Sequence, residues 1–528
     1  MSAVGLVSET RHEAMVLRGL LRLLPSIGDF AFLFPILFLF GRMNGALTLL
    51  GDGDTGWHIR TGEWILAHGH VPRQDIFSFT RPDGTWYAWE WLSDVLMGFL
   101  HRVGGMQAIL LGAIVLICLT TALLYRLVLR KCGNALIAFV LTAIAAAGSS
   151  IHWLARPHLF TMLFLVVFYS ILETKRMRLL FILPVIMVVW TNLHGGFLAG
   201  ILIVGAYAAG ELIGVLLARQ GADRRAGLGR SCRYGLAAMG CLAASFVNPY
   251  GWRLHEHLLR FLTRPAYFEN IAEFASISFR HPLAPFFEAM LLLGLAAAFW
   301  SVMRLRFVSF LLLVGYAHLA LLSIRNIPLF MIVAAPPVGL ALSEWLQSLR
   351  AETYGSPVNR VFRGIDSLSR RLTAVDEQPH WHVAGPIAVL ALGFVMYGHA
   401  PSPLFQAKYD SAAYPVAALA ALRDTDRIFA SDTWGGYLIY SRFPAKVFVD
   451  GRSDFYGPEF EAQYGDVSGV RYNWEAILNT YGVNTVLLAV AAPLSAALKG
   501  SPNWNVTYDD GVSIVFHINP QIENHSHN

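Results

Sequence analysis

The segment from Gly51 to Glu63 reads Gly-Asp-Gly-Asp-Thr-Gly-Trp-His-Ile-Arg-Thr-Gly-Glu and directly follows the first long apolar stretch of the chain. Asp52 and Asp54 are two residues apart, so both side chains point to the same side of an extended loop. Paired carboxylates can bind a divalent cation such as Mg²⁺ or Mn²⁺, or one can act as an acid or base toward a bound acceptor. The alternative is a Gly/Asp turn that only ends a helix.

Other polar residues also lie beside apolar segments, where placing them is costly. They fall in four short motifs: Arg156-Pro-His158, Asn192-Leu-His194-Gly-Gly, the loop with Glu273, and Arg325-Asn326. Each motif has a local explanation, such as a tight turn or a snorkelling arginine. Because all of them emerge on the same predicted side as the Asp-Gly-Asp loop, they indicate a site for an anionic, membrane-borne substrate whose phosphate contacts arginine.

The composition of the chain is that of a polytopic membrane protein, so transmembrane helices must position these residues. Of the 528 residues, 55% are hydrophobic and 14% are charged, and the mean hydropathy is +0.50. Because about 20 apolar residues cross a bilayer, we predict a mainly α fold with about eleven transmembrane helices. They are expected at residues 28–50, 107–126, 134–151, 158–172, 179–193, 196–217, 233–248, 285–303, 306–324, 327–346 and 384–400.

Charge predicts the orientation of these helices. If the N-terminus is cytoplasmic, the basic loops all fall on the cytoplasmic side, as the positive-inside rule expects; they include Arg126–Lys131, Arg219–Arg233 and Arg350–Arg371. This predicts a multi-pass protein of the inner (cell) membrane whose C-terminal part is periplasmic or extracellular. The pI of about 9.0 is then a topology signal. It gives no reason to expect a nucleic-acid partner.

The composition changes near residue 401. Strand-like runs at Lys446–Val449 and Thr485–Val490 alternate with helical patterns at Tyr414–Leu422 and Trp474–Thr480. We therefore predict a transmembrane domain over residues 1–400, with a catalytic first outer loop at 51–105, and an extracytoplasmic soluble α/β domain over 401–528. The stretch 350–383 is expected to be a cytoplasmic connector with an amphipathic helix on the membrane surface.

This layout resembles the GT-C superfamily of membrane glycosyltransferases, and most of all the catalytic subunits of oligosaccharyltransferases. The segment Asp54–Arg60 has the Asp-to-Arg spacing of that family's first-loop motif. The segment His194–Phe197 is similar to its Trp-Gly-Gly-Tyr turn, and Asn270–Glu273 to its Ser/Thr-Ile/Val-x-Glu motif. Arg325 matches in position the arginine that contacts the lipid pyrophosphate. The segment Trp434–Tyr437, followed by Asp450, resembles the Trp-Trp-Asp-Tyr-Gly region.

Two departures from the family pattern concern the metal and the acceptor. The family's second acidic pair is absent from the segment Ser149–His158, so His152, His158 or Asp52 would have to replace it as a metal ligand. The segment Trp434–Tyr437 has glycine where the family has its central Asp. Recognition of Asn-X-Ser/Thr peptides is therefore not implied, and a different acceptor is expected.

The resemblance implies an inverting glycosyltransferase that moves a sugar from a polyprenyl-phosphate-linked donor to an extracytoplasmic glycan, protein or lipid. Asp54 is the expected acid/base, and Asp52 or Glu273 would bind a divalent cation or hold the acceptor, with Asp52 and Asp54 as the candidate metal ligands. The donor phosphate would be bound by Arg325, with Arg60 or Arg156. The acceptor contacts would come from Trp434, Tyr437, Asp450 and Arg452.

Two other functions are compatible with the same sequence. A transporter or lipid flippase would share the hydrophobic series and a polar site near the midplane, although transporters tend to show repeated halves, and we find no second copy of the Asp-Gly-Asp loop. A non-catalytic membrane scaffold could bind glycan or protein partners through its C-terminal part. A scaffold predicts that Asp54 and Arg325 are dispensable.

Overall fold

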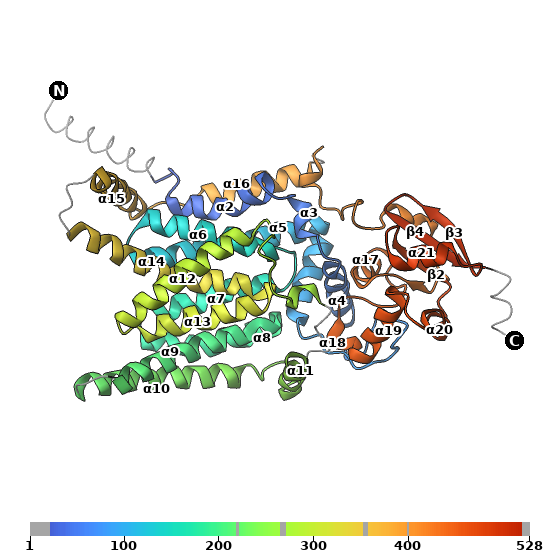
Figure 1. Cartoon of the computed structure of the whole chain (residues 1–528), viewed down its shortest axis with the longest axis horizontal. Coiled ribbons are helices and arrows are strands. Elements are labelled where there is room, and N and C mark those ends of the chain that lie inside the picture. The colour runs from blue at the N-terminus through green and yellow to red at the C-terminus, as the bar shows by residue number, and fades with distance from the viewer. Residues whose placement is uncertain (1–21, 218–220, 265–270, 352–356, 399–400, 520–528) are drawn as a thin grey trace, which may run out of the picture.

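The computed structural model describes residues 22–217, 221–264, 271–351, 357–398 and 401–519. Figure 1 shows an elongated molecule in which a bundle of long helices meets, at one end, a smaller unit formed by the C-terminal part of the chain. The helix α4 (Asp54–His68) lies between the bundle and this unit. Asn270 of the Asn270–Glu273 motif lies outside the described residues.

The helices of the bundle follow the predicted apolar segments closely. They are α2 (Ile27–Gly41), α5 (Trp91–Cys132), α6 (Ala135–Ser149), α7 (His158–Glu173), α8 (Ile182–Leu193), α9 (Leu198–Leu217), α10 (Gly221–Ala244), α12 (Ala284–Met303), α13 (Phe307–Leu322), α14 (Ile327–Ala351) and α16 (Ala384–Tyr397). The first of them begins with a capping box, in which the Ser26 side chain accepts from the Asp29 backbone and Asp29 accepts in return from the backbone of Ser26.

Within the described residues, five helices are long and apolar enough to cross a membrane, and five shorter apolar helices accompany them. These ten match ten of the predicted segments, whereas the segment at 233–248 falls on α10, which is not among the apolar helices. The mainly helical fold class is thus confirmed, but the predicted number of transmembrane helices is not. The predicted surface helix in 350–383 corresponds to α15 (Pro357–Asp376), which lies at the end of the bundle far from the C-terminal unit (Figure 1).

Short 3₁₀ segments interrupt the helices at the end of the bundle that faces the C-terminal unit. They are η1 (Ser150–His152), η3 (Gly195–Phe197), η5 (Ala272–Phe274) and η6 (Ile324–Asn326). Segments η5 and η6 are joined by a hydrogen bond from the backbone of Ile324 to Ala275, 2.9 Å long. Each of these segments leaves polar backbone and side chains at the bundle end. Non-helical backbone is tolerated near a membrane where it is buried in protein or lines a water-filled cavity.

The C-terminal unit contains a four-stranded sheet in the order β1-β2-β4-β3. Strand β1 (Ile428–Phe429) is parallel to β2 (Thr485–Ala489), and β4 (Ser513–Ile518) pairs antiparallel with both β2 and β3 (Trp504–Asp509). The helices of the unit are α17 (Asp432–Arg442), α18 (Ser453–Tyr456), α19 (Pro458–Ser468), α20 (Trp474–Thr480) and α21 (Pro493–Lys499). The predicted strand at 485–490 and helix at 474–480 are confirmed.

The predicted strand Lys446–Val449 pairs instead with the loop between α4 and α5. Val447 donates its backbone N–H to Phe77, 2.9 Å away, and accepts from the backbone of Phe79, 3.1 Å away. A second junction joins α4 to α17 at a close helix crossing: a Cβ on Gly436 would lie 2.6 Å from the carbonyl oxygen of Gly53. Only glycine allows this approach. These two junctions fix the C-terminal unit against the loop that carries the acidic pair.

Candidate functional site

A cavity of about 750 Å³ opens between the end of the bundle and the C-terminal unit. Its wall includes five of the predicted site residues from the bundle side: Asp52, Asp54, Arg156, Glu273 and Arg325. The C-terminal unit contributes residues of α19, the first residues of α17 and Arg452. The polar motifs that the sequence places on one side of the membrane therefore converge on one cavity.

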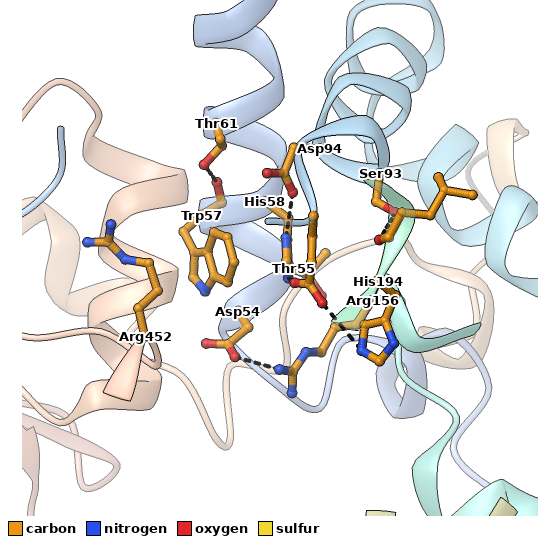
Figure 2. A network of polar contacts seen from close by, with 12 residues as sticks. Asp54, Thr55, Trp57, His58, Thr61, Ser93, Asp94, Arg156, His194 and Arg452 are labelled. Carbon is orange, nitrogen blue, oxygen red and sulfur yellow. Dashed lines mark hydrogen bonds and ion pairs between the residues drawn. The ribbon is translucent and has the colours of Figure 1, made fainter. Parts of the chain in front are cut away.

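Arg156 is the centre of an acidic cluster in this cavity. One guanidinium nitrogen lies 2.5 Å from Asp52 and 3.0 Å from Glu273, and the other lies 2.9 Å from Asp54. Figure 2 shows the contact between Asp54 and Arg156. The pKa of Glu273 lies below its usual value: burial alone would raise it, but the nearby positive charge of Arg156 and that of Arg325 outweigh burial. The cluster brings together residues from three separate loops.

Local structure explains where the two aspartates point. Asp54 is the first residue of α4, where the helix dipole favours a negative charge. Asp52 accepts a hydrogen bond of 2.9 Å from the backbone N–H of Asp54, as in an Asx turn. Burial raises the pKa of Asp54 well above its usual value, and the charge of Asp52 adds to this increase, while Arg156 opposes it. Asp54 is thus both charge-paired and largely removed from solvent.

Arg325 in η6 also lines the cavity. Its guanidinium lies over the ring of Phe274, 4.5 Å from the ring centre. The neighbouring Ser323 donates a hydrogen bond of 2.8 Å to the backbone of Glu273. Within the described residues, the structure shows no salt bridge to Arg325. A guanidinium stacked on an aromatic ring without a carboxylate partner is suited to binding an external anion.

A second cluster of polar side chains borders the same cavity, which Glu90, Asp94 and His194 line. Glu90, Asp94 and His58 were not predicted from the sequence as site residues. His58 of α4 is fully buried, and its Nδ1 lies 2.6 Å from Asp94 of α5. Glu90, the residue that caps α5, lies one helical turn before Asp94. Its carboxylate is 3.7 Å from Nε2 of His58 and 3.3 Å from Nε2 of His194. Acidic residues at the start of a long apolar helix were the available sequence signal.

Burial shifts the acid–base behaviour of this second cluster. It lowers the pKa of His58 and of His194 well below the usual value, with contributions from nearby arginine and histidine charges. It raises the pKa of Glu90 to about 7, against the opposing charges of Arg156 and Arg325. The two imidazoles are therefore neutral near pH 7, whereas Glu90 exchanges its proton there.

Arg452 and Asp450 join the C-terminal unit to the first outer loop. Arg452 makes two hydrogen bonds of 2.7 Å to Asp450 and lies 2.9 Å from Asp75 of the loop. Its guanidinium also lies 4.5 Å from the ring centre of Trp86. Arg452 reaches the cavity wall, but Asp450 does not. This buried network positions the loop more directly than it offers groups to a ligand.

Three other predicted site residues lie away from the cavity wall. Arg60 binds the backbone carbonyl of Tyr440, with nitrogen–oxygen distances of 3.0 and 2.5 Å, and pairs with Glu63 at 2.6 Å. Trp434 is buried and donates to the backbone of Ala413 at 2.9 Å. Tyr437 is buried among tyrosine rings. Arg60 thus joins α4 to α17, whereas Trp434 and Tyr437 pack within the C-terminal unit.

Asp52, Asp54 and Glu273 are the carboxylates that could bind a divalent cation near the acidic pair. Within the described ranges, no group of three or more His, Cys, Asp or Glu side chains is arranged to hold a metal ion. The oxygens of Asp52, Asp54 and Glu273 are directed instead at the Arg156 guanidinium. His152 and His158 line the cavity but contact each other, since Nε2 of His158 lies 2.7 Å from the backbone oxygen of His152. In this arrangement, the Arg156 guanidinium lies where a cation bound between these carboxylates would lie.

Comparison with known proteins gives a relationship at the level of the fold. No protein-family profile matches the chain, and no curated protein sequence is significantly similar to it. Among solved structures, the chain is similar to the archaeal oligosaccharyltransferase AglB from Archaeoglobus fulgidus, in complex with an inhibitory peptide and a dolichol-phosphate. The TM-score is 0.52 at 13% identity, and the match covers 94% of this chain and 74% of that chain.

A second structure, the Archaeoglobus fulgidus oligosaccharyltransferase in complex with zinc and sulfate, matches with a TM-score of 0.49 and 13% identity, over 93% of this chain and 73% of that chain. The similarity to AglB confirms the predicted resemblance to oligosaccharyltransferases at the level of the fold. The chain is a multi-pass membrane protein that shares the fold of the archaeal oligosaccharyltransferase AglB.

Proposed function

We propose that this protein is an integral membrane glycosyltransferase that moves a sugar from a polyprenyl-phosphate-linked donor to an acceptor on the side of the membrane where the C-terminal unit lies. The observation that carries this proposal is the cavity that is lined by Arg325, by the Arg156 cluster and by Asp54. The complex of AglB with a peptide and dolichol-phosphate supports the same pairing of lipid donor and acceptor. We also propose that the protein lies in the inner membrane with a cytoplasmic N-terminus, because its basic loops fall on one side of the predicted helices.

In the proposed reaction, the lipid-linked phosphate enters the cavity from the bilayer and contacts Arg325. Arg156 is a second guanidinium on the cavity wall, and it already pairs with Asp52, Asp54 and Glu273. A charge-assisted contact of this kind contributes about 1.5–3 kcal/mol. Asp54 orients the acceptor nucleophile for attack on the anomeric carbon. The carbon–oxygen bond to the phosphate breaks as the new glycosidic bond forms, so the configuration at that carbon inverts. Asp52 and Glu273 hold Arg156 and Asp54 in place.

The predicted divalent cation on Asp52 and Asp54 remains a prediction. Because Arg156 already forms ion pairs with both carboxylates, no step of the proposed reaction depends on a cation. Acceptor recognition by Asp450, Trp434 and Tyr437 also remains a prediction; since these side chains are buried, their effect on the acceptor would be through the position of Arg452 and α17.

The test is turnover of lipid-linked sugars by purified protein in lipid nanodiscs. Polyprenyl-linked sugars extracted from membranes are added with a mixture of candidate glycan and peptide acceptors, and free polyprenyl phosphate or pyrophosphate is measured by mass spectrometry. Release of the lipid phosphate together with a glycosylated product is expected. In proteoliposomes, movement of intact lipid-linked sugar between leaflets without bond cleavage would instead identify a flippase, and neither release nor movement would leave a binding scaffold.

A further inference from the structure

We propose that Glu90 gains and loses a proton in this site, and that in the proposed reaction it takes the proton of the acceptor while Asp54 orients that acceptor. This inference rests on the proposed function for its catalytic part. The sequence predicts Asp54 as the acid/base, but its carboxylate contacts the Arg156 guanidinium at 2.9 Å. Within the described residues, the salt-bridge contacts of Glu90 are to histidine rings only.

The position of Glu90 is fixed by two helices that meet at glycine. Glu90 and Asp94 lie one turn apart at the start of α5, so they reach the two nitrogens of the same His58 ring, Asp94 at Nδ1 and Glu90 at Nε2. Helix α4 brings His58 there because it crosses α5 closely at Gly62, where a Cβ would lie 1.7 Å from the backbone oxygen of Asp94. The arrangement is thus built into the packing of α4 against α5.

Hydrogen bonds define the tautomers of the two imidazoles that face Glu90. Nδ1 of His58 lies 2.6 Å from Asp94. We assign Nδ1 as the donor to the ionised carboxylate of Asp94, and in this tautomer Nε2 of His58 carries no proton and faces Glu90. Nδ1 of His194 accepts from the backbone of Gly196 at 3.0 Å and lies 2.8 Å from the hydroxyl of Thr161. The proton of His194 is therefore on Nε2, directed at the other oxygen of Glu90. One ring offers Glu90 an acceptor and the other a donor.

This pair of neighbours suits a carboxyl group that changes protonation state. When Glu90 is ionised, Nε2 of His194 and the backbone of Gly195 stabilise the charge. When Glu90 is protonated, its hydroxyl can turn to Nε2 of His58, a fully buried atom that has no hydrogen-bond partner in the resting arrangement. Buried polar atoms rarely stay unpaired. The unpaired Nε2 is therefore the expected partner of the protonated state.

The proton balance of the step is complete. The nucleophile of the acceptor forms its bond to the anomeric carbon, the electron pair of the breaking bond leaves with the phosphate oxygen, and the proton of the nucleophile moves to Glu90. Protonated Glu90 then bonds to His58, whose tautomer Asp94 maintains. His58 and Asp94 are positioning residues, since they act through Glu90. The charged groups that face Glu90 from other elements are Arg156, Arg325 and Asp454.

The activity test compares Glu90→Gln with wild type across pH 5.5–8.5, using extracted polyprenyl-linked sugars. The wild-type rate should rise with pH through a midpoint near 7, because burial raises the pKa of Glu90 to about that value and the ionised form is the base. Glu90→Gln should lower the rate about 100-fold or more and remove this pH dependence. The matched control is Glu256→Gln on α11 (Trp252–Thr263), whose side chain is 47% exposed; it should behave as wild type.

A second measurement does not depend on turnover. Infrared difference spectra of the protein in nanodiscs, recorded as pH is raised, should show protonated carboxyl absorption that disappears near pH 7. Burial also raises the pKa of Glu461 on the cavity wall to about 7, so the contribution of Glu90 is the part of this band that is lost in Glu90→Gln. A band that is unchanged in Glu90→Gln would overturn the role of Glu90. In His58→Asn, the pH midpoint at which Glu90 loses its proton should fall. The asparagine amide can still donate to Asp94, but the acceptor for the hydroxyl of protonated Glu90 is lost.

The outcomes separate the two proposals. An active wild type with an equally active Glu90→Gln, or the absence of any such band, overturns the role of Glu90 and leaves the proposed function intact. An inactive wild type counts against the proposed function, and the infrared titration then decides alone whether Glu90 exchanges a proton.

Discussion

Asp54 at the start of α4 and Arg156 before α7 form an ion pair of 2.9 Å at the wall of the cavity. Because the same guanidinium also contacts Asp52 and Glu273, it connects the first outer loop to η5. Arg156 therefore fixes the geometry on which the proposed reaction depends.

Removing the guanidinium should destabilise the protein. In Arg156→Gln, the carboxylates of Asp52, Asp54 and Glu273 lose their common partner, and partly buried groups left without a partner cost about 1–3 kcal/mol. We expect a lower midpoint of thermal unfolding in nanodiscs. The control is Arg370→Gln on α15, whose side chain is 75% exposed. Equal unfolding midpoints for the two variants would show that the cluster does not stabilise this junction.

Donor binding should depend on the charge of Arg325. We expect Arg325→Gln to raise the half-saturating concentration of lipid-linked sugar about 10- to 100-fold, which corresponds to the loss of about 1.5–3 kcal/mol, while Arg325→Lys retains part of the affinity. Saturation curves for phosphate-lipid release measure this effect, with Arg370→Gln again as the control. An unchanged half-saturation point would mean that the donor phosphate is bound elsewhere.

The crossing of α4 and α17 should tolerate no side chain at Gly436. An alanine there would place its Cβ 2.6 Å from the backbone of Gly53, so α17 must move away and carry the cavity wall with it. We expect Gly436→Ala to lower both the unfolding midpoint and the transfer rate. Gly364→Ala on α15, where a Cβ meets nothing within 4 Å, should leave both unchanged or raise stability slightly. A fully active Gly436→Ala protein would refute this role of the crossing.

Arg452 should hold the first outer loop in place. Lysine keeps the charge but cannot contact Asp450 through two nitrogens and also reach Asp75 while covering Trp86. We therefore expect Arg452→Lys to increase hydrogen exchange in residues 73–94 and to lower the unfolding midpoint. Arg471→Lys, at a side chain that is 72% exposed, is the comparison for stability and exchange. Equal exchange in the two variants would show that the loop is held by other contacts.

The sequence predicted the positions of site residues at helix ends better than the positions of residues buried where helices pack against each other. Asp54, Arg156, Glu273 and Arg325 could be placed together because polar residues beside apolar segments must emerge at a bundle end. Trp434 and Tyr437 were expected at the acceptor, since a Gly-Gly sequence does not distinguish a turn from a close helix crossing. Arg60 shares the predicted motif spacing with Asp54, but it lies more than one helical turn away on α4 and contacts α17.

Glu90 and His58 were missed as site residues for a related reason. The pairing of His58 with Asp94 depends on the crossing of α4 and α5, which is a tertiary contact between separate segments. The strand-like run at Lys446–Val449 shows the same limit, because its alternation indicated an extended segment but not that its partner is the first outer loop.

The most direct test of the central claim is the release of polyprenyl phosphate or pyrophosphate from lipid-linked sugar by wild type beside Asp54→Asn. The matched control is Asp424→Asn, at a fully exposed carboxylate of the C-terminal unit. The account predicts release by wild type and by Asp424→Asn, with a decrease of about 100-fold or more in Asp54→Asn. Release at equal rates from all three proteins would contradict it.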